Sequence, residues 1–435
     1  MNCTHHNIRV YAKRILSRKD LNTLSASARS SHQQDHYLSR GSAEYKRGSL
    51  ALFAAGLATF AVLYCVQPLF PVFTKTMNLT PAAASITLSV STILLAISLP
   101  IAGFISDRVG RKSLMSISLV ISSICCLLTA LAPNYGSLLI IRAFQGIVLA
   151  GLPAIAMTYL SEEMEPKSLG FAMGLYISGN TVGGLFGRIS VGTITDLSSW
   201  RWAIGVLAMI SLIASIYFWR HLPASRHFTP KKMQPKEVLS LFAAQFHDKG
   251  LVCLFILGGV LMGGFVTMYN YLGYRLSDAP YHLSQTVLGW IFILYLVGTF
   301  SSTFMGKLSD RLGRSKVLWI NLALMLFGIL VTLSSHLLLI LFGAAVVTFA
   351  FFGAHSTASS WVGSRAKLGK AQASSLYLLF YYVGSSLGGT VGGLFWSRAG
   401  WTGIVDMISI LLLIAMFVSL ELTVVLPKKA PHLLK

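Results

Sequence analysis

The chain has 435 residues, of which 54% are hydrophobic and only 11% are charged. A soluble domain carries about 25% charged residues, so this composition excludes an ordinary soluble protein and indicates a polytopic membrane protein. The formal net charge of +21 would suit a nucleic-acid partner, but the charges gather between apolar runs, which indicates membrane topology instead. The five cysteines show no C-x-x-C or Cys/His spacing, so neither a disulfide nor a metal site is expected.

Twelve apolar runs follow a polar, basic N-terminal segment. Residues 1–48 lack the apolar stretch of a signal peptide and are predicted to form a disordered cytoplasmic tail. About 20 helical residues cross roughly 30 Å of hydrocarbon, and each later run approaches that length. The runs cover residues 50–73, 83–106, 113–132, 137–160, 169–192, 202–219, 250–273, 284–305, 316–335, 337–362, 373–396 and 402–426. The sequence therefore predicts an all-α membrane protein with twelve transmembrane helices.

The longest connection between the runs divides them six and six. It covers residues 220–249 and contains three prolines and a lysine cluster, so we expect a cytoplasmic linker. On either side we expect two pseudo-symmetric six-helix bundles, residues 49–219 and 250–427, with a short tail at 428–435.

Lysine and arginine set the predicted orientation, because cytoplasmic loops are enriched in both. Of the 35 such residues, 29 fall on the side of the N-terminus, and four fall in loops on the other side: Lys75, Arg201, Arg275 and Arg398. Both termini are therefore predicted to be cytoplasmic.

One loop pattern occurs twice, at positions separated by about half the chain. The first copy follows the second run and the other follows the eighth: Gly103, Asp107, Arg108, Gly110 and Arg111, then Gly306, Asp310, Arg311, Gly313 and Arg314. A second pattern repeats at nearly the same separation: Gly179, Gly183 and Gly184 return as Gly384, Gly388 and Gly389. Two patterns with nearly one offset indicate a duplicated half. Glycines spaced by three and four share one helix face, where they allow close helix packing.

Twelve spans with this loop after spans two and eight resemble the major facilitator superfamily over residues 50–427. Arg142-x-x-Gln145-Gly146 resembles a motif of its proton-coupled members. Gly179-Asn180-x-x-Gly183-Gly184 is similar to an exporter motif, with Asn180 in place of its proline. Tyr64 to Pro68 and Leu160 to Glu163 resemble the acriflavine-sensitivity branch of drug:proton antiporters. The resemblance implies efflux of drugs or small metabolites across the bacterial inner membrane, driven by a proton gradient, without a cofactor, by a monomer embedded in lipid.

The repeated loop is expected to hold the two halves together on the cytoplasmic side, as the resemblance implies. Asp107 can pair with Arg111, or face the positive end of a neighbouring helix. One of Glu162, Glu163 and Glu165 could join Arg111, and a solvated acidic turn is the alternative. The other reading of both loops is that their basic residues only set topology.

Proton-coupling candidates are few, because no acidic residue lies in the middle of spans one to eleven. Arg142, Gln145 and His355 are the candidates, since intramembrane polar residues are costly and often functional. Arg142 could instead snorkel to water, and His355 could be an interfacial histidine. Arg188 is interpreted as a snorkelling residue unless it lines the vestibule.

The candidate cavity residues are polar or aromatic residues deep in the spans: Tyr64, Gln67, Asn180, Tyr269, Asn270, Tyr381 and Tyr382. Substrate sites in such folds lie near the midplane between the repeats. With no deep acidic residue, this set suits neutral or amphiphilic compounds.

Other functions stay open. Sugar or sugar-derivative efflux, nutrient uptake, and a membrane sensor with a transporter fold are the alternatives. An enzyme is not expected, since no H-E-x-x-H or Walker pattern occurs.

Overall fold

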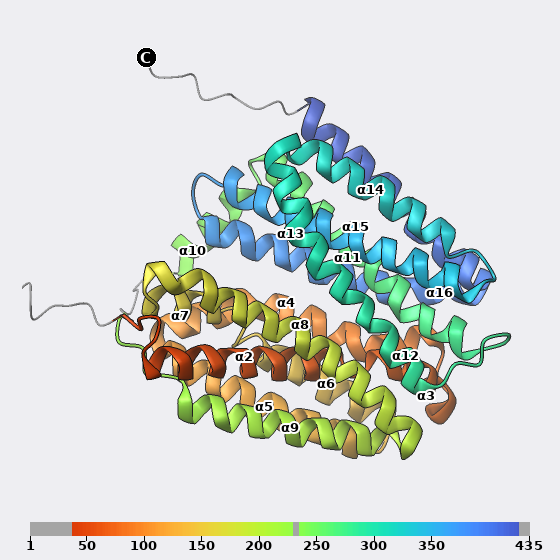
Figure 1. Ribbon diagram of the computed structural model, residues 1–435, viewed down its shortest axis with the longest axis horizontal. Coiled ribbons are helices and arrows are strands. Elements are labelled where there is room, and N and C mark those ends of the chain that lie inside the picture. The colour runs from red at the N-terminus through yellow and green to blue at the C-terminus, as the bar shows by residue number, and fades with distance from the viewer. Residues whose placement is uncertain (1–36, 229–234, 426–435) are drawn as a thin grey trace, which may run out of the picture.

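The computed structural model describes residues 37–228 and 235–425, and these fold into helices (Figure 1). In chain order the elements are α2 (Ala43–Tyr64), η1 (Gln67–Leu69), α3 (Phe70–Met77), α4 (Pro81–Val109), α5 (Arg111–Leu131), α6 (Tyr135–Leu149), α7 (Ala156–Glu163), α8 (Pro166–Leu197), α9 (Trp200–His221), α10 (Pro235–Gln245), α11 (Lys249–Ser277), α12 (Gln285–Ile291), η2 (Phe292–Leu294), α13 (Tyr295–Leu312), α14 (Arg314–Val331), α15 (Leu337–Arg365), α16 (Lys370–Leu420) and η3 (Glu421–Val425). Among the described residues, nine helices are long and apolar enough to cross a membrane.

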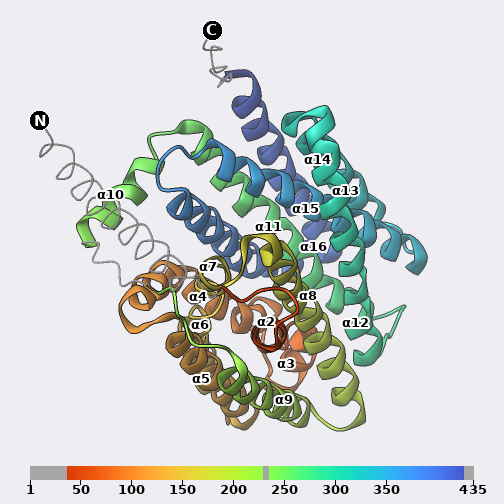
Figure 2. The same ribbon diagram turned by 60° about the vertical axis from the view of Figure 1, so that its left-hand side comes forward.

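The helices gather into two groups, α2 to α9 and α11 to α16, which lie on opposite sides of the molecule in both views (Figures 1 and 2). In the first group α2 packs on α8, α4 on α6 and α5 on α9. In the second group α11 packs on α16, and α15 packs on α13 and α14. We call the two groups the first and second bundle.

Glycines bring the central helices of each bundle into backbone contact. A Cβ atom at Gly179 or Gly183 of α8 would lie within 3.0 Å of a backbone carbonyl of α2. A Cβ atom at Gly384 or Gly388 of α16 would lie equally close to the backbone of α11. Larger residues would force these helix pairs apart, so the two repeated glycine faces act in the same way in both bundles.

Several predicted spans are interrupted where the sequence supplies a proline or a glycine. The prediction of one continuous helix over 137–160 is wrong, because turns around Gly151 and Pro153 separate α6 from α7. Pro68 lies in the 3₁₀ turn between α2 and α3. Ala399 and Gly400 break α16 into two legs, at the place between the runs predicted over 373–396 and 402–426.

The segments outside the spans are also more ordered than predicted. Helix α2 begins at Ala43, inside the predicted tail, and Leu38 pairs with the backbone of Glu163 and Glu165. The predicted linker contains α10, whose apolar residues face α4 and α16. Residues 1–36 and 229–234 lie outside the described part of the chain, as does the predicted tail at 428–435.

The two bundles meet at one end, which we call the closed end. There, the Thr74 and Tyr274 hydroxyls lie 2.7 Å apart, across α3 and α11. The Asp196 carboxylate, at the end of α8, accepts hydrogen bonds from the backbone N–H groups of Gln285 and Thr286 at 3.1 and 2.6 Å. These two N–H groups begin α12, so Asp196 caps a helix of the opposite bundle.

Toward the opposite end, which we call the open end, α4 and α16 are separated by an apolar groove of about 390 Å³. Its lining comes from α4, α10 and α16: Pro100, Ile101, Phe104, Val238, Leu239, Phe242, Ser375, Leu376 and Leu379. Within residues 37–228 and 235–425, the hydrogen bonds between the bundles lie from the middle of the molecule to the closed end. The bundles thus form a V that is shut at one end.

Candidate functional site

A cavity of about 130 Å³ lies where the two bundles face each other near the centre of the helices. Both bundles line it, with mostly aromatic side chains: Phe60, Tyr64, Asn180, Thr181, Gly184, Arg188, Met262, Phe265, Val266, Tyr295, Phe351, Phe352 and Tyr381. A concave, largely apolar site with a few polar groups is the usual form of a small-molecule site. We call it the central cavity.

Arg188 is the charged side chain of the central cavity, and it is only 2% exposed. Its Nε donates to the Gln67 side-chain oxygen and its Nη1 to the Gly184 carbonyl, both at 2.8 Å. A Cβ atom at residue 184 would lie 3.1 Å from Nη1, so the glycine leaves room for the guanidinium group.

Aromatic rings from both bundles surround this guanidinium group. Its carbon lies 4.4 Å from the ring centre of Tyr64, in the first bundle. The rings of Phe292 and Tyr295, in the second bundle, lie 4.6 and 5.0 Å away. Such cation–π contacts stabilise a desolvated cation. The charge of Arg188 is therefore held at the interface that must rearrange if the bundles move.

Arg188 forms no ion pair with the described residues, although five ion pairs occur elsewhere among them. Those pairs join Arg111 to Asp107, Arg111 to Glu162, Arg226 to Glu44, His227 to Glu163 and Arg365 to Asp248. Of the two interpretations of Arg188, snorkelling to water or lining the vestibule, the structure therefore favours the second. The spacing of Arg188 from Asn180 was the available signal, because residues 180, 184 and 188 share a helix face.

Arg142 is also buried, but it lies outside the lining of the central cavity. It donates to the carbonyl oxygens of Thr87, Val62 and Leu63 at 3.0, 3.1 and 2.7 Å, and to Gln145 Oε1 at 2.5 Å. Gln145 in turn donates to the Ser122 carbonyl at 2.9 Å. Arg142 thus satisfies carbonyls near the C-terminal end of α2, and the pair joins four helices of the first bundle.

The predicted cavity residues separate into three sets. Tyr64, Asn180 and Tyr381 line the central cavity. Gln67 and Asn270 lie beside it and connect the bundles, since the Gln67 amide donates to the Asn270 side-chain oxygen at 2.7 Å. Two others are buried in the second bundle: Tyr269, whose hydroxyl is 2.7 Å from that of Thr348, and Tyr382.

His355 lies behind the aromatic wall of the cavity. Its Nδ1 is 2.9 Å from the Tyr377 hydroxyl. Its ring stacks on Phe351 and lies 4.8 Å from the ring of Tyr381, both of which line the cavity. The structure therefore places His355 one side chain away from the cavity and far from Arg142 in the other bundle.

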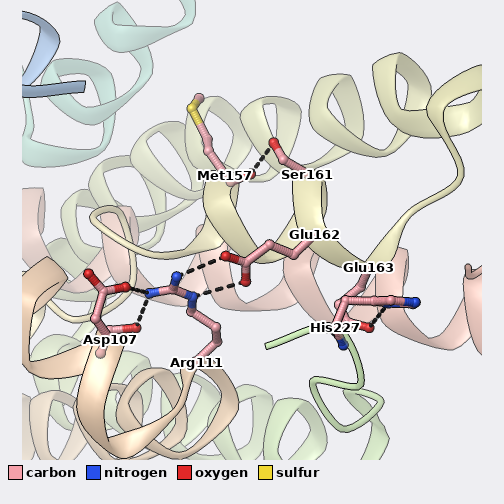
Figure 3. A network of polar contacts seen from close by, with 8 residues as sticks. Asp107, Arg111, Met157, Ser161, Glu162, Glu163 and His227 are labelled. Atoms are coloured by element: carbon pink, nitrogen blue, oxygen red, sulfur yellow. Dashed lines mark hydrogen bonds and ion pairs between the residues drawn. The ribbon is translucent and has the colours of Figure 1, made fainter. Parts of the chain in front are cut away.

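The first copy of the repeated loop forms a buried ion-pair network (Figure 3). Arg111, 4% exposed, donates from Nη1 to Asp107 at 2.6 Å, and from Nε and Nη2 to the two oxygens of Glu162 at 3.0 and 2.8 Å. Glu163 instead binds the backbone and ring of His227. Arg111 thus ties α4 and α5 to α7, with a bidentate contact on Glu162. All three helices belong to the first bundle.

The second copy is more open. Arg314 donates to the Ser364 hydroxyl, while Asp310 and Arg311 are exposed and form no ion pair with the described residues. Both copies keep the glycine that turns the chain, Gly110 and Gly313, at φ values of 101° and 87°. These angles are strained for other residues. Arg108 lies over the ring of Phe104, and a Cβ at Gly103 or Gly306 would meet open space.

The family model for the Major Facilitator Superfamily matches residues 52–281 and 276–434. The chain belongs to the major facilitator superfamily. This match confirms the predicted family. The chain is therefore a multi-pass transporter of the bacterial inner membrane, and its role is to carry a small-molecule substrate and not to catalyse a reaction.

Two relatives and one solved structure show how far the similarity extends. The chain is 49% identical to the MFS-type transporter YybF of Bacillus subtilis over 88% of this chain and 95% of that protein. It is 48% identical to the inner membrane transport protein YnfM of Escherichia coli over 90% and 94%. A bacterial homologue of the human lysosomal transporter Spinster shares the fold, with a TM-score of 0.74 and 15% identity over 90% of this chain and all of that one.

Proposed function

We propose that this superfamily member is a secondary active exporter that carries small molecules out of the cytoplasm by alternating access, driven by protons. The observation that carries the proposal is the central cavity, which lies between two bundles that touch at one end and separate at the other. Movement of one bundle against the other about such a site would expose it to each side in turn.

In this proposal the open end faces the cytoplasm. The positive-inside rule supports this assignment, because the basic loops after α4 and α13 and the basic linker before α11 lie at that end. Twelve spans follow when α2 with α3, α6 with α7 and α12 with α13 each count as one, and when α16 counts as two. Both termini are then cytoplasmic. A single chain supplies both bundles and the whole cavity, so a monomer suffices.

The groove at the open end is where the bundles would close. Helices α4 and α16 already touch in the middle of the molecule, where the Thr92 and Ser386 hydroxyls lie 2.8 Å apart. Gly103, one turn from the network of Asp107, Arg111 and Glu162, has open space around it. A glycine there would let α16 approach α4 when the groove closes. The network would hold α4, α5 and α7 together as one body during that movement.

His355 is the proton-coupling residue that the geometry supports best. Arg142 uses its hydrogen bonds on carbonyls and Gln145, so a supporting role fits it better. His355 is hydrogen-bonded to a tyrosine and stacked on the cavity wall. The imidazole ring can take up and release a proton. Protonation of His355 could thus change the position of Phe351 and Tyr381, which line the cavity.

The test uses inside-out vesicles acidified inside, to which a panel of dyes, neutral drugs, pentoses and aromatic acids is added. Export coupled to protons should release protons from the vesicles when a substrate enters, and Asp107→Asn should abolish the release. Matched vesicles without the protein are the control. Movement of a labelled substrate without proton movement would contradict the coupling. A substrate that moves only in the opposite direction would favour nutrient uptake.

A further inference from the structure

We propose that the central cavity binds a small organic anion, specifically a carboxylate with an aromatic or other apolar body, and that Arg188 is the residue that recognises its charge. This inference rests on the proposed function, since it takes the central cavity as the substrate site. It replaces the expectation of neutral or amphiphilic substrates, which was based on the lack of a deep acidic residue.

The first step is the charge of the cavity. Arg188 is 2% exposed and forms no ion pair with the described residues. Buried charges are normally paired, because removing an ion from water is costly. Rings at 4.4 to 5.0 Å offset part of this cost, but a ring supplies no negative charge. An anion in the cavity would supply the missing charge.

The second step is the set of unused donors. A guanidinium group has five N–H donors. The hydrogen bonds of Arg188 within the described residues use Nε, toward Gln67, and Nη1, toward Gly184. Its Nη2 donates to none of the described residues. A carboxylate accepts from guanidinium N–H groups with short, charge-assisted bonds. The free part of the group is therefore matched to a carboxylate, and Gln67 and Gly184 fix its orientation.

The third step is the size and character of the walls. A volume of about 130 Å³ is close to that of a cavity that holds one benzene ring, about 150 Å³. Phe60, Phe265, Phe351 and Phe352 supply apolar faces. The polar groups beside Arg188 belong to Asn180, Thr181 and three tyrosines, Tyr64, Tyr295 and Tyr381. A strongly hydrated inorganic anion would lose its water against these walls without replacement. A carboxylate on a small apolar body would fill both parts of the site.

Arg188 could otherwise serve only to hold the bundles together, since Phe292 and Tyr295 belong to the second bundle. That role does not distinguish a carboxylate from a neutral analogue of the same shape. A charge-recognition role does, because only the carboxylate gains from the guanidinium charge. The comparison of an acid with its amide therefore separates the two roles.

The experiment is isothermal titration calorimetry on the purified full chain in detergent at pH 7, with benzoate, phenylacetate and cinnamate and their three amides as probes. For the wild type, we expect at least one acid to bind about tenfold or more tightly than its amide, as a charge-assisted hydrogen bond predicts. Arg188→Gln should remove the preference, and Arg188→Lys should retain part of it.

Two further variants keep the test independent of the folding of Arg188→Gln. Gly184→Ala places a Cβ 3.1 Å from Nη1, so it should shift the guanidinium group and lower the ratio of acid affinity to amide affinity. Arg201→Gln is the matched control. Like Arg188, Arg201 combines two hydrogen-bond acceptors with a cation–π contact: it donates to two backbone carbonyls and lies over one aromatic ring. It lies at the closed end, outside the cavity lining. Its loss should leave the preference intact.

The proposal is overturned if the wild type binds none of the acids, if acids and amides bind equally, or if the preference survives in Arg188→Gln. Its failure is distinct from failure of the proposed function. Proton release driven by other compounds, without acid binding, would retain the exporter and reject the anion site. Acid binding that depends on Arg188, without any transport, would retain the anion site and reject the exporter.

Discussion

Two buried arginines of the first bundle, Arg142 and Arg188, show opposite ways to hold a cation among apolar helices. Arg142 donates to three backbone carbonyls and one amide oxygen near the C-terminal end of α2. Arg188 uses Nε and Nη1 only, and aromatic rings from both bundles cover it. A saturated cation stabilises structure, whereas a cation with free donors at a cavity is available to a ligand. A functional arginine is therefore identified by guanidinium N–H groups that have no protein acceptor, and not by burial alone.

The largest expected effect is on folding, at Arg142. Arg142→Gln removes donors from the carbonyls of Val62, Leu63 and Thr87, and each unsatisfied buried carbonyl costs about 1–3 kcal/mol. We expect the yield of monodisperse protein in detergent to collapse, measured by fluorescence-detected size exclusion. A normal yield, with a melting temperature near that of the wild type, would show that Arg142 is not needed for the stability of the fold.

Arg188→Gln is the matched change, with the opposite expectation. The variant loses two hydrogen bonds from a charged group, worth about 1.5–3 kcal/mol each, but it also removes an unpaired buried cation, whose desolvation costs several kcal/mol. We expect a near-normal yield and transport reduced about 100-fold or more, since the lost interaction involves a charged group. Vesicle transport normalised to the amount of protein checks both points. Collapse of folding, as severe as for Arg142→Gln, would mean that the two arginines do not differ as described.

The two copies of the repeated loop extend the comparison to a third buried arginine, Arg111, which is paired with two carboxylates. Asp107→Asn should abolish transport while the protein stays in the membrane, because it unbalances this network. Asp310→Asn should leave transport within about twofold of wild type, because an exposed carboxylate without an ion pair contributes little. Equal losses in the two variants would show that the loops act alike despite their different contacts.

The smallest effect is expected at the closed end. Asp196 accepts two N–H hydrogen bonds at the start of α12, and a negative charge at a helix N-terminus is worth about 0.3–1 kcal/mol. Asp196→Asn should raise the population opened at this end by about fivefold at most. Spin labels at the exposed residues Thr76 and Leu338 would report it. An unchanged distance distribution would show that Asp196 does not help to hold the closed end shut.

The sequence predicted the helices well, because apolar length and glycine spacing are local properties that a membrane enforces. The repeated glycines were assigned to helix packing. Gly179, Gly183, Gly384 and Gly388 do lie against neighbouring backbones, whereas Gly184 and Gly389 face side chains. One glutamate was expected beside Arg111, and Glu162 is that residue. The break between α6 and α7 was missed, because a turn buried within a bundle leaves hydropathy unchanged.

The cavity was harder to predict, because it depends on contacts between distant segments. Tyr64, Asn180 and Tyr381 were chosen as polar or aromatic residues deep in the spans, and they line the central cavity. For Arg188, the depth along the helix favoured snorkelling and left a place in the vestibule only as the alternative. Its environment is decided by Gln67 and by rings of the other bundle. No spacing within α8 encodes the partners that α12 and α13 provide.

The most direct test of the central claim, that the cavity opens at one end at a time, is a pair of distances measured by double electron–electron resonance in liposomes. Labels at Val109 and Leu368 report the open end, and labels at Thr76 and Leu338 report the closed end; all four residues are exposed. The account predicts that one distance shortens as the other lengthens when the proton gradient or a substrate is applied. Two distances that stay fixed under all conditions, or that change together, would contradict it.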